Sequence, residues 1–346
     1  MSGKWTVDDT GSMEVRQVSS RILHYRGRKR RDVLFVAVLA FCFMGLQAQS
    51  RLSPNETQLP DEYTGAVAIQ WIGNDRQAVL HEDGTVEIVK NHSIETTFKP
   101  TPELELADRF SVNWKDKAVA VESSDTLIAS FPGGHRETFN IPVYAIALRL
   151  LQSGIVLVAR DHIYSYKSLS PGATPENEIE TAPANSASID DKGQVVAELT
   201  EKGSVVIFDI SQGGIKERCR VGGVPFLTNR IAFYGGDVFL AEDEFNVVRL
   251  LQVSRVCQLN EIVRLPGKGS VEWMSVAAGK AALVVEDLSM PINERRLEIV
   301  NLESGRHTVM AKPNQDYGPV AISPSGKTIA IILNPSTLEI LAVEKR

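Results

Sequence analysis

The chain has 346 residues, of which 43% are hydrophobic and 23% are charged, and its formal net charge at pH 7 is −6. A domain of about this size buries about 75% of the surface that its unfolded chain exposes, so it can fold without a disulfide framework. The excess of acidic residues repels phosphate backbones, which disfavours nucleic acid as a partner.

The N-terminal region predicts export. A basic cluster between Arg26 and Arg31 precedes an uncharged apolar run from Val33 to Leu46, which is shorter than the roughly 20 residues of a membrane-spanning helix. Leu46-Gln47-Ala48 resembles a signal-peptide cleavage site, with the cut expected after Ala48. We therefore expect a disordered basic region at 1–32, a signal segment at 33–48 and an exported domain at 49–346. An uncleaved membrane anchor is the alternative.

Cleavage would make the domain more acidic. Residues 49–346 contain 29 basic and 39 acidic residues, a net charge of −10. After removal of the signal we expect a periplasmic or secreted protein that is not embedded in the membrane.

From Ala66 onward, short apolar stretches separated by Gly, Asp, Asn or Pro are typical of strands joined by turns. The first unit predicts four strands: Ala66 to Trp71, Gln77 to His81, Thr85 to Val89 and Ile94 to Phe98. Glu82-Asp83-Gly84 would form the tight turn between the second and third strands.

Similar quartets recur along the rest of the chain. They begin near Ala66, Arg109, Val143, Asn185, Arg230, Ser270 and Pro319. Most of these spacings match the roughly 40 to 45 residues of a four-stranded propeller blade. The sequence therefore predicts an all-β fold, a single β-propeller of about seven four-stranded blades preceded by an export signal. Seven quartets are too many strands for the alternative, a two-sheet sandwich.

The last unit ends after its third strand, close to Arg346. Its outer strand would have to come from the segment between Ser50 and Tyr63, where Pro54 and Pro60 allow only a short edge strand. We expect the two ends of the domain to pair and close the ring.

One hairpin carries a family resemblance. Residues 322–330 have the sequence Ile-Ser-Pro-Ser-Gly-Lys-Thr-Ile-Ala, which resembles the strand, turn and strand of WD-repeat-like bacterial propellers. The resemblance covers the fold of residues 64–346, although the chain lacks the Trp-Asp dipeptides of true WD repeats. It implies a binding scaffold more often than an enzyme and transfers no catalytic residue.

The chain contains no motif that predicts catalysis or metal binding. Gly326-Lys327-Thr328 matches the end of a phosphate-binding loop, but Ala321 stands where such a loop needs Gly, so we expect a hairpin turn. The histidines are scattered without the short spacing of metal ligands. We therefore assign no catalytic residue and no metal ligand from the sequence.

Carboxylates recur where the second strand of a unit turns into the third. The candidate ligand-binding residues of this acidic rim are Asp83, Asp125, Asp161, Glu201, Asp243 and Asp287. Propeller geometry places equivalent turns on one face, where converging carboxylates would bind calcium, a basic peptide or another cation. Asp also favours tight turns for local reasons, and we prefer that interpretation. We expect no cofactor, with calcium as the alternative.

Cys219 and Cys257 fall on the expected outer strands of two neighbouring units. Neighbouring blades diverge outward, whereas a disulfide needs Cα atoms within about 7 Å. We therefore expect two buried thiols.

Trp71, Trp114 and Trp273 lie in or just after expected first strands, next to the ring axis. We expect them to pack between blades, and a pocket that stacks on sugar rings is the alternative.

The function that this pattern favours is a non-enzymatic, extracytoplasmic scaffold that binds a protein or an extended ligand on one propeller face. The alternative is a propeller enzyme, a hydrolase or lyase acting on a sugar or lactone, with a carboxylate or metal site at the axis. Titratable groups converging at the axis would favour the enzyme.

Overall fold

A computed structural model describes residues 56–58, 65–100, 104, 106–107, 109–113, 115–123, 126–130, 136–140, 144–152, 154–168, 173–224, 230–243, 246–289, 294–310, 315–334 and 336–343. All of them belong to one compact unit, Leu52–Arg346. This part of the chain contains no helix that is long and apolar enough to cross a membrane. The expected export segment lies outside the described residues, so export stays a prediction.

The described strands form seven four-stranded antiparallel sheets, which we number as blades 1 to 7 in chain order of their first strands. Blade 1 consists of β2 (Ala66–Ile72), β3 (Arg76–His81), β4 (Val86–Lys90) and β5 (Ser93–Phe98). Blade 2 consists of β6 (Arg109–Asn113), β7 (Ala118–Ser123), β8 (Thr126–Ser130) and β9 (Arg136–Asn140). Blade 3 consists of β10 (Ala145–Leu151), β11 (Gly154–Ala159), β12 (His162–Tyr166) and β13 (Asn177–Glu180). Blades 4 and 5 are β14 (Ala184–Ile189), β15 (Val195–Thr200), β16 (Ser204–Ser211) and β17 (Gly214–Gly222); and β18 (Arg230–Tyr234), β19 (Asp237–Glu242), β20 (Arg249–Val253) and β21 (Leu259–Arg264). Blades 6 and 7 are β22 (Gly269–Ala277), β23 (Lys280–Asp287), β24 (Glu294–Asn301) and β25 (His307–Met310); and β26 (Tyr317–Ile322), β27 (Thr328–Leu333), β28 (Thr337–Ala342) and β1 (Glu56–Gln58).

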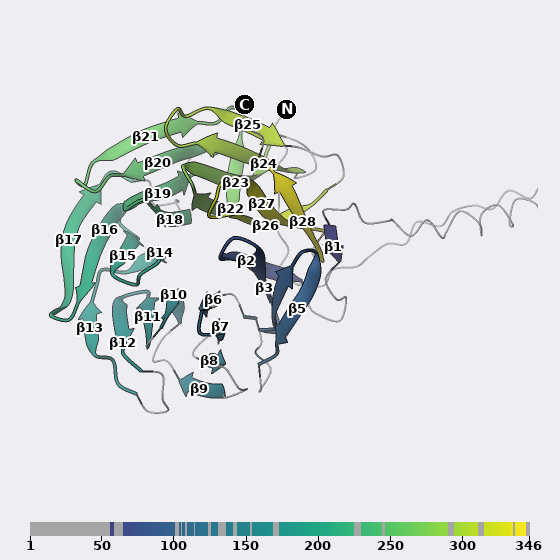
Figure 1. The fold of residues 1–346 in the computed structure, drawn as a ribbon. Helices are drawn as coiled ribbons and strands as arrows, with labels where there is room; N and C mark the ends of the chain where they lie inside the picture. The colour runs from purple at the N-terminus through teal and green to yellow at the C-terminus, as the bar shows by residue number, and fades with distance from the viewer. Residues whose placement is uncertain are drawn as a thin grey trace, which may run out of the picture. The chain divides into compact units, whose positions relative to one another are not determined.

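The sheets are arranged as the blades of a single ring (Figure 1). The first strand of each blade lies nearest the centre, and the last strand lies at the periphery. The prediction of an all-β propeller with seven four-stranded blades is therefore confirmed. Each predicted unit also begins within two residues of an observed first strand.

The two ends of the domain close the ring. β1 pairs antiparallel with β28, with Glu56 opposite Glu339 and Gln58 opposite Thr337, and so supplies the fourth strand of blade 7. This confirms that the segment before Tyr63 provides the missing outer strand. Pairing the ends in one sheet gives the first and last parts of the domain a shared set of backbone hydrogen bonds.

Apolar side chains fill each of the seven junctions between neighbouring blades. β3 shows how one strand serves two junctions: Ala78 and Leu80 pack toward blade 2, whereas Val79 packs toward blade 7. Successive side chains of a strand point to opposite faces, so a strand covered on both faces is mainly apolar. The second strands are therefore rich in apolar residues, although buried glutamates such as Glu198 also lie in them.

The predicted turns have the expected local structure. Gly84 has a φ of +81°, and a Cβ at this position would lie 2.9 Å from Pro100 Cγ, so the tight turn after β3 requires glycine. In the hairpin between β26 and β27, Gly326 N–H donates to Ser323 O at 2.8 Å. This confirms a hairpin in place of a phosphate-binding loop.

The prediction of two free thiols is wrong, because Cys219 and Cys257 form a disulfide with their Cα atoms 6.3 Å apart. Cys219 lies on the outer strand β17 of blade 4, as expected. Cys257 instead lies in the turn between β20 and β21 of blade 5, where its φ is +62°. The prediction assumed two outer strands, which diverge from each other. A turn of blade 5 can instead approach the outer strand of blade 4, so the bond links blades 4 and 5.

Candidate functional site

The acidic rim is made of turns that join second and third strands, and each described carboxylate there has a partner close by. Asp83 accepts hydrogen bonds from the backbone N–H and the hydroxyl of Thr85, both at 2.9 Å. Asp161 contacts His162 Nδ1 at 2.8 Å, and this hydrogen bond lowers the pKa of the carboxyl group. Both carboxylates therefore have local roles in their turns.

Other carboxylates of the rim connect elements. Glu201 accepts a hydrogen bond from Arg160 Nε of blade 3 at 2.9 Å. Asp243 of blade 5 accepts hydrogen bonds from Ser270 Oγ at 2.9 Å and from Val271 N at 3.1 Å, both at the start of blade 6. Such contacts hold neighbouring blades together at this face of the ring.

The remaining rim positions follow the same pattern or lie outside the described residues. Asp287 accepts hydrogen bonds from Ser289 and pairs with Arg296 at 3.1 Å; the Ser289 contacts lower the pKa of Asp287 most. Asp125 is outside the described residues. Within the part of the chain that the structure describes, no group of three or more His, Cys, Asp or Glu residues has the arrangement of a metal site. Binding of calcium or of a basic peptide at the rim stays a prediction.

The tryptophans have separate environments. Trp71 of blade 1 donates its indole N–H to Ala321 O of blade 7 at 2.8 Å. Trp273 lies 5.1 Å from Arg295 Cζ, in a cation–π contact, and packs against the core between blades 6 and 7. Trp114 is outside the described residues. The two described indoles therefore serve the packing between blades that the sequence favoured.

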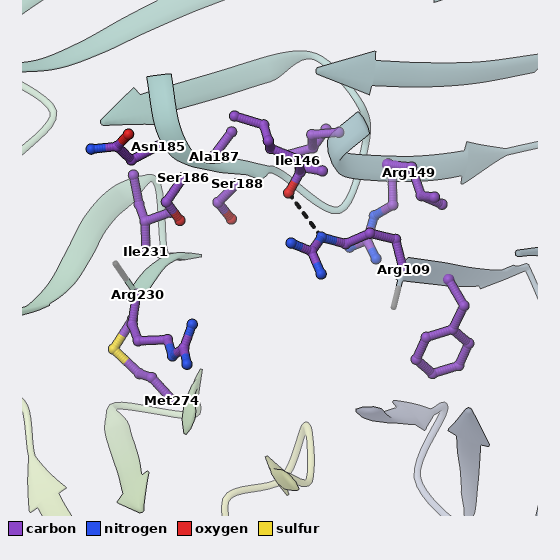
Figure 2. Close-up of a pocket in the computed structure, with 14 residues that line it drawn as sticks. Arg109, Ile146, Arg149, Asn185, Ser186, Ala187, Ser188, Arg230, Ile231 and Met274 are labelled. Atoms are coloured by element: carbon purple, nitrogen blue, oxygen red, sulfur yellow. Dashed lines mark hydrogen bonds between the residues drawn. The ribbon is translucent and has the colours of Figure 1, made fainter. Parts of the chain in front are cut away.

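The ring axis contains a different kind of charge. A cavity of about 420 Å³ is lined by the first strands of blades 2 to 6. Among the described residues that line it, the charged ones are arginines from three separate blades: Arg109 of β6, Arg149 of β10 and Arg230 of β18. In Figure 2 Arg109 and Arg230 face one open space from different sides, with Ser186 and Ser188 of β14 on the side of Arg109 and Met274 beside Arg230.

These arginines differ in how they are held. Arg109 donates from Nε to Ile146 O at 3.2 Å, which fixes its direction across the junction of blades 2 and 3. Arg149 pairs with the exposed carboxylate of Asp191, while its buried Nε has no hydrogen-bonding partner among the described residues. For Arg230 the described part of the chain provides neither a hydrogen bond nor a salt bridge to the guanidinium, and its Nε is buried.

Burial lowers the pKa of Arg230, and the nearby charge of Arg109 lowers it further, whereas Glu272 and Asp243 raise it. Burial therefore outweighs the attraction of the two carboxylates, neither of which contacts the guanidinium. An arginine stays protonated in a protein even when its pKa falls. Arg230 thus holds a positive charge that its own surroundings compensate incompletely.

A second, larger cavity of about 1180 Å³ adjoins the first, because both are lined by Arg109, Arg149 and Met274. Its wall includes turns that join first and second strands in blades 1, 4, 5, 6 and 7. In an antiparallel blade these turns lie at the opposite end of the strands from the acidic rim. The larger cavity therefore lies on the face of the ring opposite the rim.

Sequence reasoning missed the axial arginines. Arg109 and Arg230 marked the beginnings of two predicted units but received no role. A positive charge at the start of an inner strand is unexpected, because that strand is packed between blades. An arginine at this position is therefore a signal that the sequence itself contains. What the sequence did not contain was the meeting of arginines from positions 109, 149 and 230 in one cavity.

Comparison with known proteins identifies the fold. No protein-family model matches the chain, and no curated protein sequence matches it. The solved structures with a similar fold include the β-propeller domain of Cps50 (Swd1) from Myceliophteria thermophila, with a TM-score of 0.66 and 13% sequence identity over 84% of this chain and 100% of that domain. At this identity the similarity concerns the fold alone, so the chain shares the β-propeller fold of that domain.

Proposed function

We propose that this protein is an extracytoplasmic binding scaffold that holds a protein or another extended ligand on one face of the ring. The observation that carries the proposal is the cavity of about 1180 Å³ among the turns between first and second strands. A rigid, closed ring that presents loops around a hollow is well suited to binding, because the loops can vary without disturbing the packed blades. We assign the ligand to this face.

Two features support a location outside the cytoplasm. The basic cluster and short apolar run before Ala48 have the pattern of a secretory signal. The Cys219–Cys257 disulfide is an independent feature, because structural disulfides persist in oxidising compartments and are rare where glutathione keeps thiols reduced.

A non-catalytic role is preferred because the described axis does not gather carboxylates or histidines from different blades. Among the described residues, the lining of the two axial cavities includes no histidine, and its carboxylates are Asp190 and Asp191 of a single turn. Acid–base or metal-assisted hydrolysis at the axis would require such groups within reach of one substrate.

Photo-crosslinking from both faces of one blade tests the binding face. Lys192 and Lys202 are both exposed and lie at opposite ends of β15, so a photo-reactive amino acid can replace either with a similar effect on the fold. In cells that produce the protein, we expect a crosslinked adduct from position 192 and none from position 202. Adducts from position 202 alone would place the ligand on the acidic rim, and equal adducts from both would contradict a preferred face.

Peptide mass spectrometry without reduction tests the compartment. Protein recovered outside the cytoplasm should begin at or near Gln49 and contain a peptide in which Cys219 is linked to Cys257. Recovery from the cytoplasm of a chain that starts at Met1 or Met13, with both thiols open to alkylation, would contradict export.

A further inference from the structure

We infer that the axial cavity of about 420 Å³ binds a small organic anion through Arg109, Arg149 and Arg230. The anionic group is an oxyanion, a carboxylate or a phosphate, and the rest of the ligand is apolar. This inference goes beyond the proposed function, because it concerns a small molecule at the axis and not the extended ligand on the face.

The charge of the cavity opposes the charge of the protein. Among the described residues, three arginines line it and no carboxylate does, although acidic residues outnumber basic ones, 43 to 37, in the whole chain. Like charges within one cavity repel one another, and Arg109 lies close enough to lower the pKa of Arg230. Packing alone gives no reason to bring cations from three blades to one place.

An anion would supply what Arg230 lacks. The guanidinium has five N–H donors, and the described residues accept a hydrogen bond from none of those on Arg230. Arg230 is partly buried, and a charge partly removed from water without a partner is unfavourable, so a bound oxyanion would offset part of that cost. The planar fork of arginine also matches the two oxygens of a carboxylate or phosphate.

Neutral donors complete the polar side of the cavity. Ser186 and Ser188 of β14 line it, and neither hydroxyl has a hydrogen bond to another described residue. Figure 2 shows both beside the open space that Arg109 and Arg230 face. Hydroxyl groups with free O–H donors can join guanidinium groups in holding an oxyanion.

Part of the remaining wall is apolar and favours an organic ligand, while Asn185 adds an amide. Phe110, Ile231 and Met274 line the same cavity from blades 2, 5 and 6. Its volume lies within the range of small-molecule pockets, roughly 300–1,000 Å³. An inorganic ion would leave this apolar surface uncovered, whereas an aromatic or aliphatic acid would cover it.

Calorimetric titration of the purified protein tests the inference without any partner. The probes are sodium benzoate, phenyl phosphate, inorganic phosphate and the neutral analogue benzamide, all at one ionic strength. We expect saturable binding of benzoate or phenyl phosphate with a dissociation constant on the order of 1 mM or below. Benzamide and inorganic phosphate should bind at least about 10-fold more weakly, because benzamide lacks the negative charge and inorganic phosphate lacks the apolar ring.

Three variants locate the site. Arg230→Met keeps an unbranched apolar stem and removes the charged guanidinium, and Arg230→Lys keeps the charge and removes the fork. Arg264→Met removes an exposed arginine on β21 that pairs with Glu261. Arg230→Met should weaken binding of the better probe by about 10- to 100-fold, and Arg230→Lys should weaken it less. Arg264→Met should leave the affinity unchanged.

Thermal melting of each variant verifies that it folds. The inference is overturned if neither aromatic anion saturates the protein, if benzamide binds as tightly as benzoate, or if folded Arg230→Met binds as wild type does. Binding of inorganic phosphate as tight as that of phenyl phosphate would also overturn it, because the apolar wall would then have no part in recognition.

Discussion

Charged side chains gather both on the acidic rim and at the ring axis, but the two regions differ in whether the protein supplies partners for these charges. On the rim, Asp83 accepts from its own turn and Asp243 accepts from the next blade. At the axis, Arg230 has no such contact within the described part of the chain. The charges that recur most regularly in the sequence therefore have protein partners, whereas Arg230 at the axis has none among the described residues.

The difference shows which charges to consider as binding groups. A turn carboxylate that accepts two hydrogen bonds has already exchanged water for protein donors, so a ligand would gain little from it. An arginine that has lost water without gaining acceptors is in an unfavourable state, and an anionic ligand that supplies acceptors would stabilise it. Regular recurrence in a repeat thus indicates a structural role, and an uncompensated charge in a cavity indicates a binding role.

A third charged position, inside blade 4, extends the comparison. Its substitution gives the largest expected change in the free energy of unfolding. Glu198 is fully buried and accepts a hydrogen bond from Thr181 Oγ1 at 3.3 Å, and desolvation raises its pKa from 4.5 to about 8. Because the folded pKa is raised, stability from the neutral form is complete below pH 4.5 and is lost as the pH rises through 8. Glu198→Gln should therefore be more stable than wild type at pH 9 by on the order of 4 kcal/mol, with little difference at pH 4.5.

Urea unfolding at pH 4.5, 7 and 9 measures this effect. The matched control is Glu298→Gln, since Glu298 is equally buried but contacts Arg296 Nε at 2.8 Å and His307 Nδ1 at 2.9 Å. That substitution should destabilise the domain at pH 7 by about 1–3 kcal/mol, because both donors lose a carboxylate. A Glu198→Gln difference that does not change with pH would show that Glu198 is already ionised in the folded protein.

On the rim, Asp243→Ala should destabilise the domain by about 2 kcal/mol, because the substitution leaves the Val271 amide and the Ser270 hydroxyl without their acceptor. Glu201→Ala, which removes an exposed partner of Arg160, should destabilise it by less than about 1 kcal/mol. Denaturant midpoints of the two variants measure the difference. If both variants lose equally little stability, the rim carboxylates have no structural role, and the contrast with the axis is wrong.

At the axis, Arg230→Met should have the opposite sign. In a buffer free of carboxylates and phosphate, removal of the incompletely compensated charge should raise the free energy of unfolding by about 1 kcal/mol. Saturating benzoate should then stabilise wild type and reverse the order of the two proteins. Differential scanning calorimetry with and without benzoate measures both changes. A variant that is less stable than wild type in the anion-free buffer would mean that Arg230 is compensated within the protein.

Calcium should have the smallest effect. Because the described rim carboxylates have local partners, the melting temperature should shift equally in calcium chloride and in sodium chloride of the same ionic strength. Asp83→Asn, Asp161→Asn and Asp243→Asn should leave that equality unchanged. A calcium-specific rise that disappears in these variants would instead establish a cation site on the rim.

The sequence by itself determined the blades, their number and the closure of the ring. Alternation along a strand and the conformational demands of Gly84 or Gly326 are local properties, so they can be read from a few neighbouring residues. The missing last strand was also visible, because a repeat makes an incomplete unit conspicuous. Even the pairing of β1 with β28 followed from counting strands.

Only the tertiary structure decided which distant residues meet. The disulfide depends on a turn of blade 5 that brings Cys257 to β17 of blade 4, and no local pattern records that approach. The axial cavity likewise depends on the rotation of five blades about one axis, which brings Arg109, Arg149 and Arg230 together from positions far apart in the chain. Burial and charge compensation are properties of that arrangement, so the pKa values of Arg230 and Glu198 could not be inferred from residue type or spacing.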